Sequence, residues 1–433
     1  MKTLIHGATL ITARAGFQAD VLLSDGRIEK VFRSGDAERG MQPSADNILK
    51  EWKLDPQDVR VLDAPGKYLF PGFIDVGFRY EKTRDGRDPG REDFLEETRE
   101  ALLGGTTTVI TNGEWEEAAC DFGRHARLTG EIPEEIETVA QMGTEAIAQG
   151  ITSVFLTSTK EEELTDDAVY RALIGLKKVG GLSLSRCENR ALAAALQKQH
   201  MEKKERRAAF HAMTHPVEVE AEAVNRTLYI AALADAAVVI SHLSSEAALA
   251  EVQAARKRGQ TVYVETCPQY LTLSDKFYAL SDEQADRYIC NPPLRTIRDV
   301  QMLWNAIQEE EIQIVSSNEW GEDSLIPGAE NRAAYLYREG VLKGRINRES
   351  MCAVLSENAA KLFGLYPRKG VVAEGADADL VLLDPESGNI TSVFLRGEEV
   401  VRDGEIVKES RGEFLHREKF RPLTKIKDVL YSY

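Results

Sequence analysis

Apolar and polar residues alternate in short stretches near both ends of the chain. The stretches are joined by Asp25-Gly26 near the start and by Asp403-Gly404 near the end. Asp-Gly between alternating apolar residues is typical of a β-hairpin turn. Because such strands bury one face only, we expect the two ends to pair into a small composite β-sandwich, formed by residues 1–67 and 368–433.

The central part of the chain, residues 68–367, has a different pattern. Short apolar runs are separated by helical stretches, which predicts repeated βα units. We find eight such runs, at 73–76, 108–111, 137–140, 154–156, 182–185, 238–241, 262–265 and 312–315. Eight units within about 300 residues match the size of a (β/α)8 TIM barrel, and a doubly wound sheet is the alternative. The predicted fold class is therefore α/β.

Local signals support the helices of this scheme. Ser245 opens a predicted helix and Gly259 follows its last turn, while the helix 91–103 ends at Gly104 in the same way. Residues 34–58 are polar, and we expect a surface insertion there with a short helix at 48–54.

Composition limits the classes of partner. The chain has 54 basic and 71 acidic residues, a formal net charge of −17, which disfavours nucleic acid and anionic membranes. No stretch approaches the roughly 18 apolar residues of a membrane-spanning helix. Its five cysteines lack a CxxC spacing, so we expect reduced thiols and a cytoplasmic location.

In a TIM barrel the catalytic residues follow the carboxyl ends of the strands. Of the seven histidines in the chain, only His242 stands at such an end. A catalytic zinc normally takes three protein ligands, and a two-metal site takes more. The residues at the strand ends therefore do not predict a metal centre, although a site for a single ion is still an alternative.

Several short sequence motifs resemble those of a known family. They occur at 66–75, 104–107, 242–245, 265–271, 291–295, 361–370 and 375–380. In this order they resemble the hydantoinase and dihydropyrimidinase branch of the amidohydrolase superfamily, from residue 1 to about residue 420. The resemblance implies a TIM barrel, a dimer or tetramer, and opening of cyclic amide rings by two metals that a carboxylated lysine bridges.

The same resemblance assigns ligand positions, and most of them are changed. Histidines would stand at Gly77, Arg79 and Arg186, the bridging lysine at Ser153, and the aspartate that is both ligand and base at Asn318; only His242 is retained. Ser158 takes the place of a tyrosine that acts on the reaction intermediate. We therefore expect no binuclear site and no metal cofactor, with one zinc or manganese at His242 as the alternative.

Other residues are candidates for a ligand pocket. We assign Ser158, Asn291, Arg79 and Arg186 to it, because two arginines favour an anionic or cyclic-amide ligand. The arginines have a simpler interpretation, as partners of Glu188, Glu265 or Glu319.

Few residues are left to catalyse a reaction. His242 and Glu319 are the only candidates, with Glu319 as a substitute base. We expect Cys267 to be structural and Cys187 not to be a nucleophile, because no histidine is placed to activate it.

The leading hypothesis is a catalytically silent relative of hydantoinases that binds a ligand or a protein partner, a pseudoenzyme acting as a scaffold. It would form a homo-oligomer, or a hetero-oligomer with an active relative. The alternative is a hydrolase of cyclic amides that uses an altered mononuclear or metal-free site.

Overall fold

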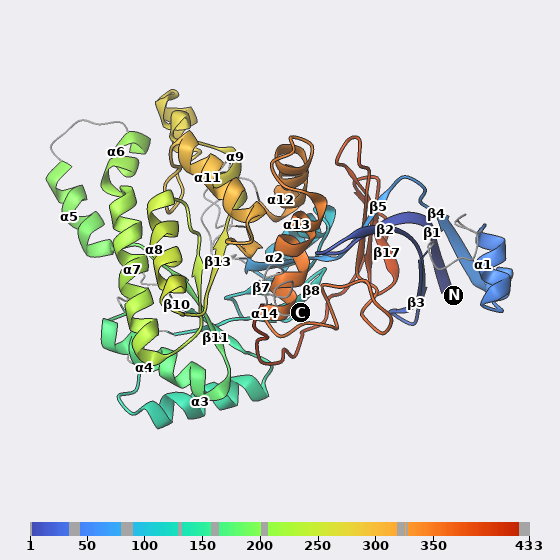
Figure 1. Cartoon of the computed structure of the whole chain (residues 1–433), viewed down its shortest axis with the longest axis horizontal. Coiled ribbons are helices and arrows are strands. Elements are labelled where there is room, and N and C mark those ends of the chain that lie inside the picture. The colour runs from blue at the N-terminus through green and yellow to red at the C-terminus, as the bar shows by residue number, and fades with distance from the viewer. Residues whose placement is uncertain are drawn as a thin grey trace.

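The computed structural model describes residues 2–33, 44–78, 90–128, 132–156, 164–200, 207–317, 325 and 328–423. It shows an α/β protein with a TIM barrel and a second domain of β-strands from both termini, which lies at the right of Figure 1. The predicted fold class is confirmed.

Strands from the two ends share one nine-stranded sheet, in the order β18-β17-β16-β15-β5-β1-β2-β3 with β4 beside β1. Its strands are β1 (Lys2–Ile11), β2 (Gly16–Ser24), β3 (Arg27–Arg33), β4 (Val59–Asp63), β5 (Tyr68–Pro71), β15 (Leu380–Leu383), β16 (Ile390–Leu395), β17 (Glu398–Arg402) and β18 (Glu405–Ile406). Both expected Asp-Gly turns are formed, and Asp25 and Asp403 have φ near 50°. The junction between the termini is the pairing of β5 with β15, so a strand that follows residue 67 belongs to this sheet.

The barrel strands run parallel. They are β6 (Phe73–Phe78), β7 (Thr106–Thr111), β8 (Asp121–Arg124), β9 (Ala126–Arg127), β10 (Ser153–Leu156), β11 (Leu182–Arg186), β12 (Val238–Ser241), β13 (Val262–Thr266) and β14 (Ile314–Val315). Only His125 separates β8 from β9, so these two pieces form one strand of the barrel between β7 and β10. Eight strand positions result, as predicted.

The gap between the first and last strands is bridged by Arg332. Its fully buried guanidinium donates hydrogen bonds to the carbonyl oxygens of Ile74 in β6, at 2.9 Å, and of Val315 in β14, at 2.8 Å. It also lies 3.6 Å from the carboxylate of Asp75. A charged side chain thus connects the two edges of the barrel.

One strand prediction is wrong. Residues 137–140 lie in helix α3 (Ile136–Ala148), and β8 with β9 takes the third position of the barrel. Val139 is buried against α4 (Asp166–Val179), where a Cβ on Gly175 would lie 2.5 Å from it. The apolar residues of this segment therefore follow the helical period.

The remaining helices cover the strands or connect them. They are α1 (Ala45–Glu51), η2 (Pro56–Asp58), α2 (Arg91–Leu103), α5 (Arg190–His200), α6 (Arg207–Thr214), α7 (Val217–Ala234), α8 (Glu246–Lys257), α9 (Pro268–Thr272), η3 (Asp275–Ala279), α10 (Asp282–Asp286), α11 (Ile297–Gln308), α12 (Ala329–Tyr335), η4 (Leu336–Val341), α13 (Arg348–Cys352), η5 (Ala353–Glu357) and α14 (Asn358–Leu362). Ser245 caps α8 by accepting from the N–H of Ala248, as predicted. The helix expected at 48–54 begins earlier, because Ser44 caps it.

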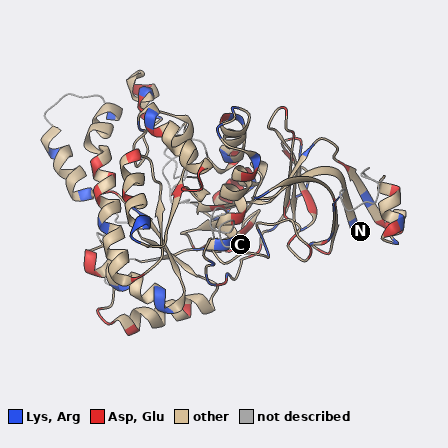
Figure 2. Cartoon of the chain, in the orientation of Figure 1, with Lys and Arg blue, Asp and Glu red and all other residues tan. Residues whose placement is uncertain are grey.

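Acidic and basic residues are both spread over the helices (Figure 2). Across the part of the chain that the structure describes, we find no helix with the length and apolar character needed to cross a membrane.

Candidate functional site

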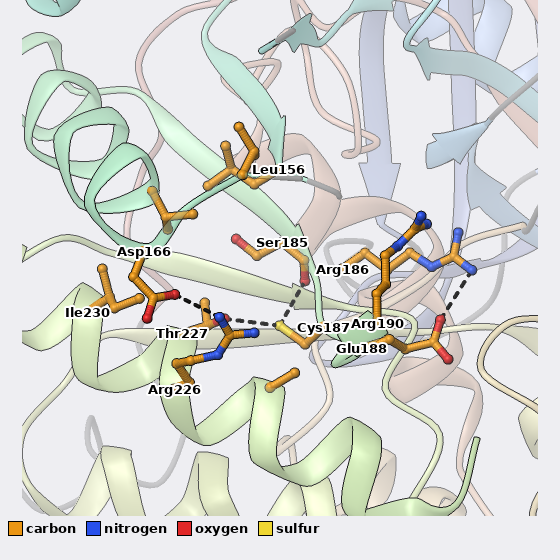
Figure 3. A pocket seen from close by; sticks show the side chains of 13 residues that line it. Leu156, Asp166, Ser185, Arg186, Cys187, Glu188, Arg190, Arg226, Thr227 and Ile230 are labelled. Carbon is orange, nitrogen blue, oxygen red and sulfur yellow. Dashed lines mark hydrogen bonds and ion pairs between the residues drawn. The ribbon is translucent and has the colours of Figure 1, made fainter. Parts of the chain in front are cut away.

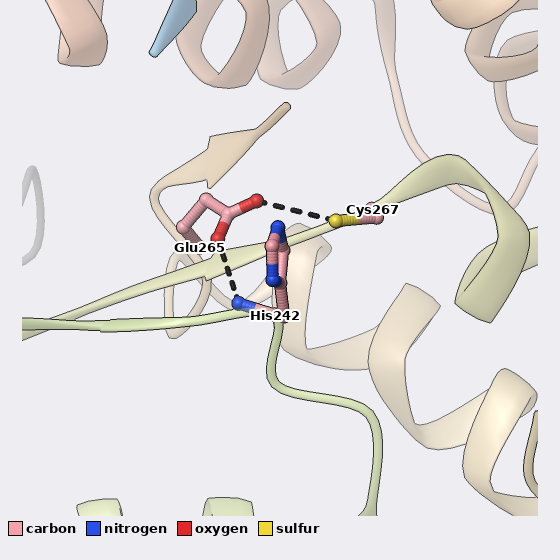
Figure 4. Close-up of side chains that lie close together, drawn as sticks. All are labelled: His242, Glu265 and Cys267. Atoms are coloured by element: carbon pink, nitrogen blue, oxygen red, sulfur yellow. Dashed lines mark hydrogen bonds between the residues drawn. The ribbon is translucent and has the colours of Figure 1, made fainter. Parts of the chain in front are cut away.

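Three metal-ligand side chains meet where β12 and β13 end. His242 follows β12, Glu265 lies in β13, and Cys267 follows it; all three are buried. One donor atom from each lies within 4.8 Å of the others (Figure 4). They meet because β12 and β13 are parallel neighbours, with Ile240 opposite Val264.

Glu265 is at the centre of this group. Its carboxylate accepts hydrogen bonds from Ser241 Oγ at 2.5 Å, from the N–H of His242 at 2.7 Å and from Cys267 Sγ at 3.3 Å. Burial raises the pKa of Glu265 to about 7. His242 has φ of 58°, an uncommon conformation for a non-glycine residue that is enriched at functional sites.

The three donors fit a metal ion. Imidazole, carboxylate and thiolate are the ligand types of zinc, and three protein ligands are typical of a catalytic zinc site. The expectation that the protein takes no metal cofactor is therefore wrong. From the sequence, Glu265 and Cys267 are not predicted as metal donors, and Cys267 is predicted to have a structural role. The position of both residues at the end of the strand beside His242 was the available signal.

The first strand contributes no such donor at Gly77. A Cβ there would lie 2.8 Å from Cβ of Ser316 and 2.9 Å from the carbonyl oxygen of Ser317, so a side chain has no room. Asp75 instead fixes this part of the barrel. Its carboxylate accepts from the N–H of Gly77 at 3.1 Å and from the N–H of Ser317 at 3.1 and 3.2 Å.

Ser153 takes part in a buried hydrogen-bond network. His125 Nε2 donates to the carbonyl oxygen of Val76 at 2.8 Å, and its Nδ1 lies 2.7 Å from Ser153 Oγ. Arg417 Nη1 donates to the same hydroxyl at 2.9 Å. Burial lowers the pKa of Arg417. The contacts of Ser153 therefore lead to His125 and to the C-terminal segment.

Arg186 lies at the end of β11. Its Nη2 donates to the carbonyl oxygen of Asn291 at 2.9 Å and lies 3.5 Å from the carboxylate of Glu188. The expected ion pair with Glu188 is thus present. Glu265, the other expected partner in the described residues, instead accepts from Ser241, His242 and Cys267. Arg186 and Asn291 are thus in contact, and their assignment to one ligand pocket stays a prediction.

A small cavity of about 60 Å³ lies beside Arg186, and charged side chains surround it (Figure 3). Five charged residues line it, together with Cys187 and seven apolar or hydroxyl residues; the charged ones are Asp166, Arg186, Glu188, Arg190 and Arg226. Its charged residues come from β11, α4, α5 and α7 and the segments next to them.

Cys187 is not an activated nucleophile. Burial raises its pKa to about 12, and its Sγ lies 3.5 Å from Thr227 Oγ1 and 3.6 Å from the carbonyl oxygen of Ser185, both of which accept from a thiol. A thiol with such a pKa stays protonated at neutral pH, and the thiolate is the nucleophilic form.

A second acidic group, Asp121 with Asp377 and Asp379, surrounds an internal cation. Lys369 Nζ lies 2.7 Å from Asp121 and 3.0 Å from Asp377, and it also contacts Asp379. Arg396 also pairs with Asp121, and Arg368 and Arg27 pair with Asp377. We interpret this group as structural, because these cations together offset its three carboxylates.

Four predicted site residues, Arg79, Ser158, Asn318 and Glu319, lie outside the described residues. The structure therefore does not place the candidate base Glu319 or the second arginine of the expected ligand pocket.

A TIM barrel with metal-ligand side chains at the carboxyl ends of its strands is typical of metal-dependent enzymes with this fold. The chain belongs to the amidohydrolase family, whose model matches residues 68–400. It is 31% identical to a D-hydantoinase of Geobacillus stearothermophilus over 494 aligned residues, covering 99% of both chains. It is 30% identical to a D-phenylhydantoinase of Escherichia coli (strain SE11), covering 98% of this chain and 99% of the relative.

Solved structures give the same result. The dihydropyrimidinase from Brevibacillus agri NCHU1002 superimposes with a TM-score of 0.82 at 28% identity, over 97% of this chain and 99% of the other. A crystal structure of D-hydantoinase has a TM-score of 0.83 at 28% identity, over 97% and 99%. The family resemblance is confirmed. These relatives favour the hydrolase alternative over the catalytically silent protein that we expected first.

Proposed function

We propose that the protein hydrolyses a C–N bond of a cyclic amide at a site that holds one metal ion between His242, Glu265 and Cys267. The observation that carries this proposal is the meeting of the three buried donors within 4.8 Å at the carboxyl ends of β12 and β13. Similarity to hydantoinases over nearly the whole chain supports the reaction class.

A bound divalent ion would polarise the amide carbonyl and activate water. The surrounding residues hold the donors in place. Ser241 and the backbone of His242 fix the carboxylate of Glu265, and Asp75 fixes the backbone of Gly77 and Ser317. Arg186 binds the carbonyl oxygen of Asn291 and thereby fixes the position of the loop that begins there. The charged cavity beside Arg186 favours a cyclic amide with a polar or anionic substituent.

The test is metal content together with turnover. The full-length protein is stripped with a chelator, reloaded with zinc or manganese, and analysed for bound metal and for ring opening of hydantoin, dihydrouracil and allantoin. We expect one ion per chain and turnover that depends on it. His242→Ala is expected to lose the ion and the activity, whereas the exposed His416→Ala is expected to retain both.

A second candidate function is binding of a ligand or partner without catalysis. It is favoured by Gly77 and Ser153, which offer no ligand where the family resemblance places a histidine and the bridging lysine. This candidate predicts stoichiometric metal with no ring opening of any cyclic amide, so the same experiment distinguishes the two.

We also propose a cytoplasmic homo-oligomer. Support for the compartment comes from five buried cysteines without disulfides. Support for association comes from Tyr229 and Leu233 on α7, whose exposed fractions are 52% and 77%. Light scattering on the purified protein measures the oligomeric state, and a monomer at micromolar concentration would contradict association.

A further inference from the structure

A cavity of about 670 Å³ lies at the other end of the barrel from the metal-ligand group. Val262, the first residue of β13, lines it, whereas Glu265 lies toward the carboxyl end of the same strand. Further lining comes from α11, α13, η5, α14 and the segment 421–423. Cavities of 300–1,000 Å³ are the usual size for small-molecule sites. The proposed hydrolase does not use this space.

The lining is basic although the chain as a whole is acidic. Four basic side chains and two acidic ones line the cavity, in a protein with a formal net charge of −17. The basic residues are Arg14, Arg256, Lys361 and Arg421, and the acidic ones are Glu310 and Glu357. Lys361 pairs with Glu357 at 2.5 Å and Arg421 pairs with Glu418 at 3.1 Å, so the remaining positive charge of the lining lies on Arg14 and Arg256. A concave surface with one predominant sign of charge concentrates ions of the opposite sign.

Arg256 contributes a positive charge that neutral groups hold in place. Its guanidinium donates to the carbonyl oxygens of Val262 and Glu311, both at 2.9 Å, and to Oε1 of Gln313 at 3.0 Å. These acceptors orient the group without cancelling its charge. Burial lowers the pKa of Arg256, which reflects the cost of this partly buried cation. An anion in the cavity would reduce that cost.

The walls of the cavity are hydrogen-bonded to one another. Asn358 Nδ2 donates to the carbonyl oxygen of Gln313 at 2.9 Å, and the N–H of Arg421 donates to the carbonyl oxygen of Lys361 at 3.0 Å. The N–H of Leu423 donates to Tyr263 Oη at 3.2 Å. The residues that surround the space therefore belong to a fixed framework.

We propose that this cavity is a second binding site, for a small organic molecule with two or more negative charges, of the phosphorylated or polycarboxylate type. The volume exceeds that of a single inorganic phosphate, and the basic lining selects the charge. Arg14 and Arg421 are exposed and mark the side from which such an anion enters.

Calorimetric titration of the full-length protein tests the proposal directly, with uridine 5′-monophosphate and citrate as the probes and uncharged uridine as the control ligand. We expect at least one dianion to bind at millimolar concentration or below, more weakly as salt is added, and uridine not to bind. The two probes distinguish a phosphate source from a carboxylate source. Failure of both dianions to bind above uridine would overturn the proposal.

Charge reversal locates the binding. The double variant Arg14→Glu with Arg421→Glu is expected to lose at least tenfold in affinity. Arg207→Glu with Arg298→Glu makes the same change in net charge at side chains that are 78% and 79% exposed and do not line the cavity, and is expected to lose less than threefold. Arg207 begins α6, and Arg298 lies in the first turn of α11, away from Ile307, the residue of α11 in the lining. Equal losses in both double variants would overturn the proposal. If the first double variant is unfolded, Arg14→Glu alone is compared with Arg298→Glu. Binding is measured without substrate, so this result is independent of the proposed hydrolysis.

Discussion

Cys267 is the residue that most affects which metal the group binds, because thiolate is the softest of its three donors. Soft ligands favour zinc over manganese, which prefers oxygen. We expect Cys267→Ser to weaken zinc binding at least tenfold and to change manganese binding less, measured by competition with a chromophoric chelator. Cys352→Ser is the matched control, since Cys352 is also buried and contacts the carbonyl oxygen of Ile11. An unchanged zinc affinity in Cys267→Ser would exclude the thiolate as a ligand.

Glu399 illustrates a different role for a buried carboxylate, in stability. It lies in β17 and bonds Arg60 at 2.6 Å, Ser392 at 2.9 Å and Arg402. Although burial opposes ionisation, bonds from both arginines and Ser392 lower the pKa of Glu399 to about 2. The ionised form is thus favoured in the folded state, so the stabilisation is complete above the ordinary pKa and is lost as the pH falls toward 2.

From this we expect Glu399→Gln to lower the free energy of unfolding by about 2 kcal/mol at pH 7. The difference from the parent protein should shrink as the pH falls from about 5 toward 2. Chemical denaturation over that range measures it. Glu398→Gln, a neighbour that is 56% exposed, should change stability by less than about 0.5 kcal/mol at any pH. A pH-independent loss in Glu399→Gln would show that its charge is not involved.

At the scale of elements, the C-terminal segment is bound to the barrel through backbone contacts. The N–H of Glu418 donates to the carbonyl oxygen of Gly364 at 2.8 Å, and the N–H of Arg417 donates to that of Gly150 at 3.2 Å. A Cβ on Gly364 would lie 1.7 Å from the carbonyl oxygen of Glu418. The segment therefore lies where only glycine permits the approach.

A comparison of two glycines with left-handed backbones distinguishes the cost of this close contact from the cost of backbone strain alone. Gly364 has φ of +70° and Gly259 has φ of +87°, but nothing lies within 4 Å of a Cβ on Gly259. We expect Gly259→Ala to cost about 1 kcal/mol. Gly364→Ala should cost at least about 2 kcal/mol more and should make the segment after residue 407 sensitive to protease. Equal losses in stability would show that the close approach does not matter.

The elements also show what the sequence pattern can predict. The apolar runs of β7, β12 and β13 are bounded by turn residues, and each run crosses the core once. A local sequence pattern is therefore enough to identify these strands. Residues 137–140 look the same over four positions, and only their packing against Gly175 shows the helical period. The sequence pattern does not predict the strand at 121–127, because the charged residues Asp121, Arg124 and Arg127 interrupt its apolar run. Asp121 is nevertheless buried, since Lys369 donates a hydrogen bond to its carboxylate.

The candidate site has the same limits. His242 was found because it is a histidine at a strand end. Glu265 and Cys267 became its partners only when the pairing of β12 with β13 was known. Arg417 approaches Ser153 from more than 260 positions away along the chain, and no local pattern indicates such a contact.

For the whole molecule, closure of the barrel depends on Arg332. This side chain joins β6 to β14 and is fully buried, with Asp75 as the acidic partner. Removing one member of a buried ion pair leaves the other charge uncompensated, which costs about 3–5 kcal/mol. The same Asp75 carboxylate holds the backbone of Gly77 and Ser317, so closure and the shape of the barrel mouth are linked.

We therefore expect Arg332→Met to lower the free energy of unfolding by about 3–5 kcal/mol. The double variant Asp75→Asn with Arg332→Met should recover part of this loss, because it removes the isolated carboxylate. Hydrogen exchange should show faster exchange at the amides of Gly77 and Ser317 in Arg332→Met, since Asp75 no longer has a fixed position. Arg298→Met, on the exposed face of α11, is the control and should leave both the stability and these amides unchanged. If Arg332→Met lost stability while the two amides kept their protection, Arg332 would stabilise the barrel without shaping its mouth.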